Sequence, residues 1–136
     1  QCITIETVGS PASGQIMGAS VDMSTGSPII AYNNTDDQGN SILKIAYRKF
    51  AGNCGPLAGF FRTWQCDVVD LGEDTNDVGY YPSLKVNSAG VVNIAYFDFT
   101  AGDLKFAVSD VAIYPTPTPS PTPTFAIDFY LPFIKK

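Results

Sequence analysis

The chain of 136 residues contains no histidine, only three cysteines and only eight lysine and arginine residues. Without histidine it has no Ser–His or Cys–His nucleophile pair and no imidazole ligand for a metal. The formal net charge of −5 argues against nucleic acid as a partner, because a phosphate backbone requires a basic face. No apolar run approaches the roughly 18 residues of a membrane span. We therefore expect no enzyme, no cofactor, no nucleic-acid partner and no membrane span.

The remaining composition is typical of an exported protein. The sequence starts at Gln1 rather than Met, which we interpret as a mature chain whose export signal has been removed. Three cysteines without a Cys-x-x-Cys motif fit an oxidising compartment better than a metal site. We expect a secreted protein, extracellular or at the cell surface.

Three segments of the sequence recur in the same order. QCITIETVG at 1–9 echoes QCDVVDLGE at 65–73, residues 18–32 echo residues 82–96, and LKIAY at 43–47 echoes LKFAV at 104–108. Three ordered matches indicate an internal repeat. The chain then divides into five parts: a first repeat (1–50), an inter-repeat insertion (51–63), a second repeat (64–113), a Pro/Thr spacer (114–124) and a C-terminal docking strand (125–136).

Each repeat has the sequence signature of four short strands, rich in β-branched and aromatic residues and bounded by Gly, Asn, Asp or Ser. The expected strands are Ile3–Val8, Ala19–Met23, Pro28–Tyr32 and Ile42–Arg48 in the first repeat, and Asp67–Leu71, Ser83–Val86, Val92–Phe97 and Asp103–Val108 in the second. No segment shows a sustained helical period. We expect an all-β fold with two four-stranded antiparallel blade-like sheets, arranged as a sandwich or propeller-like. In the insertion, we expect Phe60 and Phe61 to fold back on a sheet.

The end of the chain combines a stiff spacer with an amphipathic strand. Proline at every second position of YPTPTPSPTPT favours extended polyproline II. In the tail, alternate positions are apolar over nine residues, which predicts a strand with one wholly apolar face. These positions are Phe125, Ile127, Phe129, Leu131 and Phe133. Such a strand is expected to dock, either on its own chain or on another copy.

The motif shared by the two repeats resembles a repeat of bacterial secreted β-propellers. The second repeat carries Gly79, Tyr81, Ser83, Leu84, Val86, Ser88, Gly90, Ile94, Ala95, Tyr96, Asp98, Gly102, Asp103, Leu104, Lys105, Phe106 and Ala107 of it, and the first keeps about half of these positions. The resemblance implies blade-like sheets and says nothing about chemistry. Propellers close with four to eight blades, whereas this chain offers two. The two sheets could pack face to face, or several chains could join.

The cysteines allow three single bridges, with one thiol left over. Cys54 and Cys66 flank the insertion, and a bridge there would staple it to the second repeat. A Cys2–Cys54 bridge and an interchain bond remain open, since Cys2 occupies the repeat position of Cys66.

Other polar and aromatic groups have less specific patterns. Two acidic stretches lack the ligand order of a calcium loop and are interpreted as solvated turns: Asp36, Asp37 and Asn40, and Glu73, Asp74, Asn76 and Asp77. Three strand acids are interpreted as solvent-facing rather than as a glycosidase pair: Glu6, Asp67 and Asp70. Six aromatic residues are interpreted as sheet packing rather than as a sugar platform: Tyr32, Tyr47, Tyr80, Tyr81, Tyr96 and Trp64.

Two function classes follow from these patterns. The first is a secreted structural subunit that forms an extracellular filament or surface layer by donating its C-terminal strand to a neighbouring copy. The second is a cell-surface module that binds glycan or protein, with its tail packed on its own sheet.

Overall fold

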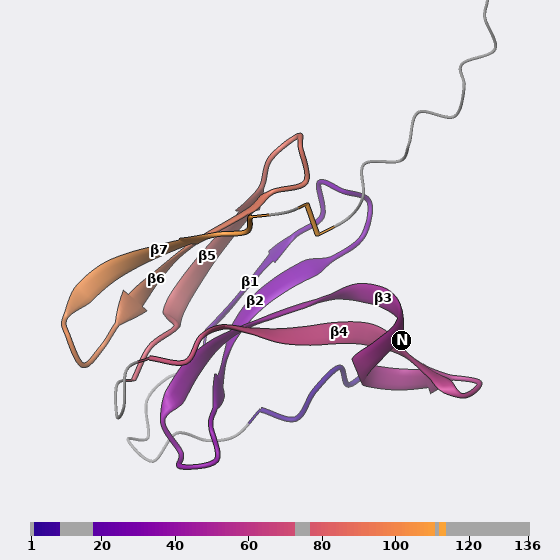
Figure 1. Ribbon diagram of the computed structural model, residues 1–136, viewed down its shortest axis with the longest axis horizontal. Helices are drawn as coiled ribbons and strands as arrows, with labels where there is room; N and C mark the ends of the chain where they lie inside the picture. Colours follow the sequence, from indigo (N-terminus) through magenta and orange to yellow (C-terminus); the bar gives the residue numbers. More distant parts are fainter. Residues whose placement is uncertain (1, 9–17, 73–76, 111, 114–136) are drawn as a thin grey trace, which may run out of the picture.

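The computed structural model describes residues 2–8, 18–72, 77–110 and 112–113 of the chain. These residues form seven strands, all paired antiparallel, and no helix among them (Figure 1). The all-β fold class expected from the sequence is therefore confirmed. The Pro/Thr spacer and the expected C-terminal strand lie outside the described residues.

The first sheet has four strands in chain order, each hydrogen-bonded to the next. They are β1 (Ala19–Asp22), β2 (Ile29–Thr35), β3 (Ser41–Ala58) and β4 (Phe61–Asp70). A short turn joins β1 to β2: Gly26 takes a φ of 80°, and its N–H donates to the carbonyl of Met23 at 3.0 Å. Glycine adopts this left-handed conformation without a steric penalty, as the sequence predicts for this turn.

Residues 51–63 are not a loop between the repeats but extend β3 and β4 into a long hairpin, which projects beyond the sheet (Figure 1). Its strand pairing shifts register between Arg48 and Cys54, since both of these residues lie opposite Trp64. The expectation that Phe60 packs on a sheet is wrong: its side chain is 96% exposed, because it lies at the hairpin turn. Phe61 instead contacts Phe50, with ring centroids 4.9 Å apart.

The second sheet has three described strands rather than the four expected. They are β5 (Tyr80–Val86), β6 (Val92–Asp98) and β7 (Asp103–Val108). Residues 67–70, expected in this sheet, lie in β4 and pair with β3 of the first sheet. The physical reason is the long hairpin, which returns the chain antiparallel along β3. The segment Ile3–Val8, expected as a strand, enters neither sheet.

The two sheets pack face to face around one apolar core. In the first sheet, we call the side that carries Ala31 and Ile45 the back face and the opposite side, with Ile30 and Tyr32, the front face. In the second sheet, the side that carries Leu84 and Ile94 is the front face, and the opposite side, with Leu104 and Phe106, is the back face. The buried residues of this core are Ile29, Ala31, Leu43, Ile45, Val78, Leu84, Val86, Val92, Ile94 and Tyr96. Burial alternates along β6 between buried and half-buried side chains, and among the described residues the first sheet covers only the front face of the second.

The sheets also meet at their β1 and β5 edges. Ser20 Oγ accepts a hydrogen bond from the backbone N–H of Leu84 at 3.1 Å, and Asp22 Oδ2 accepts one from Val86 at 3.1 Å. Corresponding strands of the two repeats therefore lie side by side. Gly79 stands at the crossing from one sheet to the other, with a φ of 84° and no room for a Cβ atom against the backbone of Leu43.

Candidate functional site

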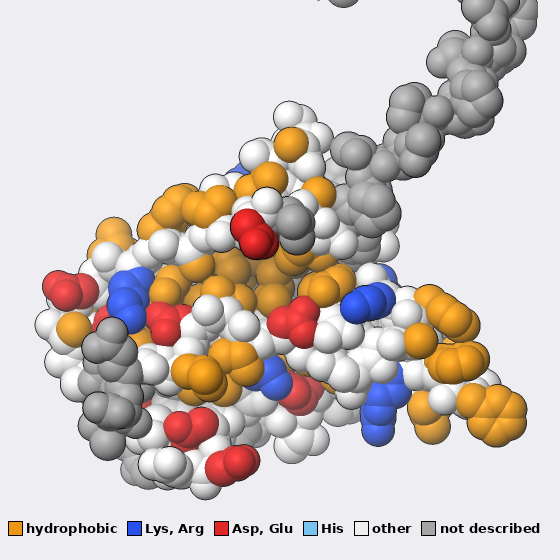
Figure 2. Space-filling model, viewed as in Figure 1, with side chains coloured by type: hydrophobic (Ala, Val, Ile, Leu, Met, Phe, Trp, Pro, Cys, Tyr) orange, Lys and Arg blue, Asp and Glu red, His pale blue; other side chains and the backbone are white. Residues whose placement is uncertain are grey.

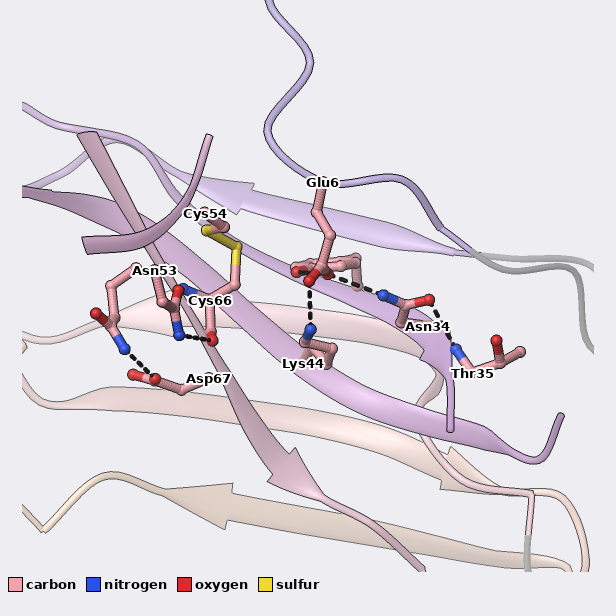
Figure 3. A network of polar contacts seen from close by, with 10 residues as sticks. Glu6, Asn34, Thr35, Lys44, Asn53, Cys54, Cys66 and Asp67 are labelled. Atoms are coloured by element: carbon pink, nitrogen blue, oxygen red, sulfur yellow. Dashed lines mark hydrogen bonds and ion pairs between the residues drawn. A yellow bond between two sulfur atoms is a disulfide. The ribbon is translucent and has the colours of Figure 1, made fainter. Parts of the chain in front are cut away.

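The long hairpin is held by a disulfide between Cys54 and Cys66, whose Cα atoms are 5.9 Å apart. This pairing selects one of the bridges that the sequence left open, and Cys2 is a free, exposed thiol. Asn53 supports the same junction: its side chain donates to the carbonyl of Cys66 and accepts from the N–H of Cys66 (Figure 3). The hairpin is thus tied to the body of the first sheet.

The front face of the first sheet carries a network of an acid, a tyrosine and a lysine. The carboxylate of Glu6 accepts hydrogen bonds from Tyr32 Oη at 2.6 Å and Asn34 Nδ2 at 2.8 Å and forms an ion pair with Lys44 (Figure 3). Burial opposes ionisation of Glu6, but these hydrogen bonds and the lysine charge together lower its pKa. The network therefore holds the segment Ile3–Val8 on the sheet, although that segment pairs with no strand.

The second sheet carries the same network at the positions that the repeat predicts. Asp70 Oδ2 accepts hydrogen bonds from Tyr96 Oη at 2.6 Å and from Lys105 Nζ at 3.1 Å. In both networks the acid precedes the tyrosine by 26 residues. The pKa of Asp70 is lowered, because the bonds from Tyr96, Gly72 and Lys105 outweigh its burial. The internal repeat read from the sequence is therefore present in the packing as well.

The interpretation of Glu6, Asp67 and Asp70 as solvent-facing is wrong, because all three are partly buried and accept hydrogen bonds. Glu6 and Asp70 each hold a segment of chain on the front face of a different sheet. Asp67 accepts hydrogen bonds from Tyr47 and from its neighbour Gln65. The structure thus places each carboxylate in its own set of contacts rather than around a shared cleft.

The six aromatic residues weighed as a sugar platform do not form one surface. Trp64 and Tyr80 are almost fully buried, and the Arg48 guanidinium lies 4.7 Å from the centre of the Trp64 ring. Tyr32 and Tyr96 donate to the two acids described above, and burial together with those acids raises the pKa of both phenols. Tyr81, in contrast, is exposed. Most of these rings therefore pack within the sheets.

The acidic turn weighed as a calcium loop is closed by its own hydrogen bonds. Asp36 Oδ1 accepts from the backbone N–H groups of Gln38 and Asn40, and Asp36 Oδ2 accepts from the Asn40 amide. Asp77 of the second acidic stretch accepts from the N–H of Ser41, while 73–76 lie outside the described residues. No cluster of three metal-ligating side chains occurs in the part of the chain that the structure describes.

The second sheet has an open edge at β7 in the described part of the chain. Among the described residues, β7 pairs with β6 alone, so its other edge has no strand beside it. Three large side chains of β7 are exposed: Leu104, Phe106 and Val108. Hydrophobic side chains accordingly gather over β7 in the space-filling view (Figure 2). An unpaired apolar edge of this kind is a site for association with another strand.

Comparisons with known proteins assign neither a family nor a function to the chain. No protein-family model matches the chain, and no curated protein or solved structure matches it either. The described residues include no helix that is long and apolar enough to cross a membrane. The fold and the edge thus define the class: an all-β protein of two packed antiparallel sheets, built on an internal repeat and stapled by one disulfide.

Proposed function

We propose that the chain is a secreted structural subunit that assembles with copies of itself by strand donation. The C-terminal strand at 125–134 of one subunit adds to the second sheet of a neighbouring subunit and forms an extracellular filament or layer. The observation that carries this proposal is the edge of β7, which pairs with no further strand of the described residues, at the place where the first sheet has its fourth strand.

Strand addition fits the chemistry of both partners. An added strand takes up the free backbone groups of a sheet edge, and alternate side chains cover the apolar face beside it. The tail sequence supplies five apolar residues at alternate positions behind a Pro/Thr spacer. Burying such side chains is worth about 1.5–3 kcal/mol each, so docking of the tail is strongly favoured over exposure in water.

The experiment compares the full chain with variants that block the apolar face of the tail. Ile127→Asp/Phe129→Asp is expected to prevent assembly, as is deletion of residues 115–136, with sedimentation velocity as the readout. Tyr130→Asp adds a charge at the opposite parity of the same strand and is the matched control, expected to assemble like the unmodified chain.

Two outcomes would contradict the proposal. One is assembly that persists in both tail variants. The other is an unmodified chain that stays monomeric and shows sugar-dependent changes in Tyr or Trp fluorescence, which would support the glycan-binding alternative instead.

A further inference from the structure

The buried contact between the two sheets supplies a template for a contact between two chains. Within the chain, the back face of the first sheet lies on the front face of the second. Each sheet has a second face, and that of the first sheet is partly covered, because Ile5 packs there against the cluster that contains Tyr32 and Ala46. These two faces are related by the internal repeat to the two faces that meet within the chain. The strand registers show which residues of the two sheets correspond.

The pairing of the middle strands fixes the correspondence. Tyr32 lies opposite Lys44 in the first sheet, and Tyr96 lies opposite Lys105 in the second. One residue along each strand, Ala31 lies opposite Ile45, as Ala95 lies opposite Phe106.

The next pair extends the register. Asn33 lies opposite Leu43, as Phe97 lies opposite Leu104. The back face of the second sheet, which carries Leu104 and Phe106, therefore corresponds to the back face of the first, which carries Leu43 and Ile45.

Burial at these corresponding positions is opposite. Leu43 and Ile45 are 0% and 5% exposed, because the second sheet covers them. Leu104 and Phe106 are 79% and 64% exposed, although they occupy the same places in the other repeat. In the part of the chain that the structure describes, the second sheet thus has an apolar back face on which no sheet lies, whereas the corresponding face of the first sheet is covered.

The front face of the first sheet shows the complementary difference. Val21 lies opposite Ile30, as Leu84 lies opposite Ile94, so Val21 and Leu84 correspond. Leu84 is 5% exposed against the first sheet, whereas Val21 is 58% exposed. Ser83 then corresponds to Ser20, whose hydroxyl bonds the N–H of Leu84 within the chain.

Each front face has a hollow, and only the hollow on the second sheet is also lined by a residue of the other sheet. The hollow of about 330 Å³ on the second sheet is lined by Ile94 and Ala107, with Ile45 of the first sheet opposite them. The hollow of about 210 Å³ on the first sheet is lined by the corresponding residues, Ile30 and Ala46. The repeat counterpart of Ile45 is Phe106, which lies on the exposed back face of the second sheet.

We propose that the back face of the second sheet docks on the front face of the first sheet of another copy and repeats the contact between the sheets within one chain. Phe106 of one copy then fills the hollow beside Ile30 of the next, and Ser83 is placed to accept from the backbone beside Val21. Because the two faces differ, the contact is head to tail. It produces a ring if the rotation closes and a filament if it does not.

This contact goes beyond strand donation, since it uses only the two sheets and needs no residue of the tail. Face docking predicts that substitutions on the two sheet faces prevent assembly, whereas strand donation predicts that substitutions in the tail do so. Separate substitutions therefore distinguish the two proposals.

The experiment blocks each face singly in the full chain, in a Cys2→Ser background that removes the free thiol. Phe106→Asp blocks the back face of the second sheet, and Val21→Asp blocks the front face of the first. Phe60→Asp changes a side chain that is even more exposed but lies on neither face, at the hairpin turn, and is the matched control. Far-UV circular dichroism checks that each variant is folded.

The result expected is complementation. Phe106→Asp and Val21→Asp are each monomeric alone, and an equimolar mixture forms a dimer that grows no further, because each variant retains one working face. Phe60→Asp assembles like its Cys2→Ser parent. The readout is sedimentation velocity at several concentrations.

Three results would overturn the proposal. If both variants assemble normally while the tail variants do not, strand donation stands and face docking fails. If Val21→Asp alone still dimerises, the contact is back to back rather than head to tail. If the mixture stays monomeric, the two faces are not partners. Loss of assembly in the face variants, with normal assembly of the tail variants, would support face docking and reject strand donation.

Discussion

At the scale of single residues, the two acid–tyrosine–lysine networks each fix a segment of the chain to a sheet with which that segment does not pair. Glu6 holds the first segment of the chain on the first sheet, and Asp70 holds the end of β4 on the second. Lys105 also lies 3.3 Å from Asp98, and its bonds to Asp70 and Asp98 raise its pKa. Hydrogen bonds to charged groups contribute more to the free energy of unfolding than hydrogen bonds between neutral groups, so each network is expected to stabilise the fold.

The network of Asp70 predicts how stability depends on pH. Its pKa is lowered in the folded chain, so the stabilisation is fully present above the ordinary value of 3.8 and is lost as the pH falls through the lowered value. Asp70→Asn should lower the free energy of unfolding at pH 7 by about 1–2 kcal/mol, because the ionised acceptor is lost. The difference from the unmodified chain should shrink below about pH 4.

Urea unfolding at pH 7 and at pH 3 measures both effects. Asp37→Asn, in the exposed turn after β2, is the control and should change stability little. A difference for Asp70→Asn that stayed constant across this range would show that ionisation of the acid does not stabilise the fold.

At the scale of elements, the β3–β4 hairpin is the part that the repeat does not explain. It has no counterpart in the second repeat, yet it carries the disulfide and the buried Trp64. Gly55 sits against the Trp64 ring with a φ of 78°, where an added Cβ atom would lie 2.5 Å from that ring. Its backbone N–H donates to the carbonyl of Ile5 at 2.7 Å, so the hairpin also helps to hold the first segment.

Removing the disulfide tests how much the hairpin stabilises the chain. Cys54→Ser/Cys66→Ser should lower the free energy of unfolding by about 3 kcal/mol, because the open chain gains conformational freedom when it unfolds. Denaturant unfolding with and without reductant measures the loss. Cys2→Ser is the control and should behave like the unmodified chain; an equal loss in that variant would mean that the bridge involves Cys2.

At the scale of the whole molecule, one core joins both sheets, so neither sheet is expected to remain folded without the other. Leu43 is fully buried between them, whereas its repeat counterpart Leu104 is exposed. Leu43→Ala should cost about 2–5 kcal/mol and lower the unfolding midpoint of both sheets together. Leu104→Ala should change the stability of the dilute, unassembled chain by less than about 0.5 kcal/mol.

Calorimetry at low concentration checks this matched pair. Separate transitions for the two sheets in Leu43→Ala would contradict a shared core. A large loss of stability for Leu104→Ala in the dilute chain would mean that its side chain is covered in the monomer.

The strands themselves were predictable because their signals are local. Alternation along 92–97 and along 103–108 and the glycine turn at Gly26 each depend on a few adjacent residues, and the structure confirms these elements. The long hairpin was missed because its glycines and its exposed Phe60 look like a loop. The pairing of 67–70 with the first sheet was missed because sequence similarity shows which segments correspond, not which edge each one joins.

The sequence by itself determined the all-β class, the internal repeat and the alternation that makes each sheet two-faced, since these depend on residue type and spacing along the chain. Only the tertiary structure decided which cysteines pair and which faces are covered. The reason is that burial depends on what lies across from a side chain. Ile45 and Phe106 occupy the same place in the two repeats, and only the stacking of the two sheets leaves one of them buried and the other exposed.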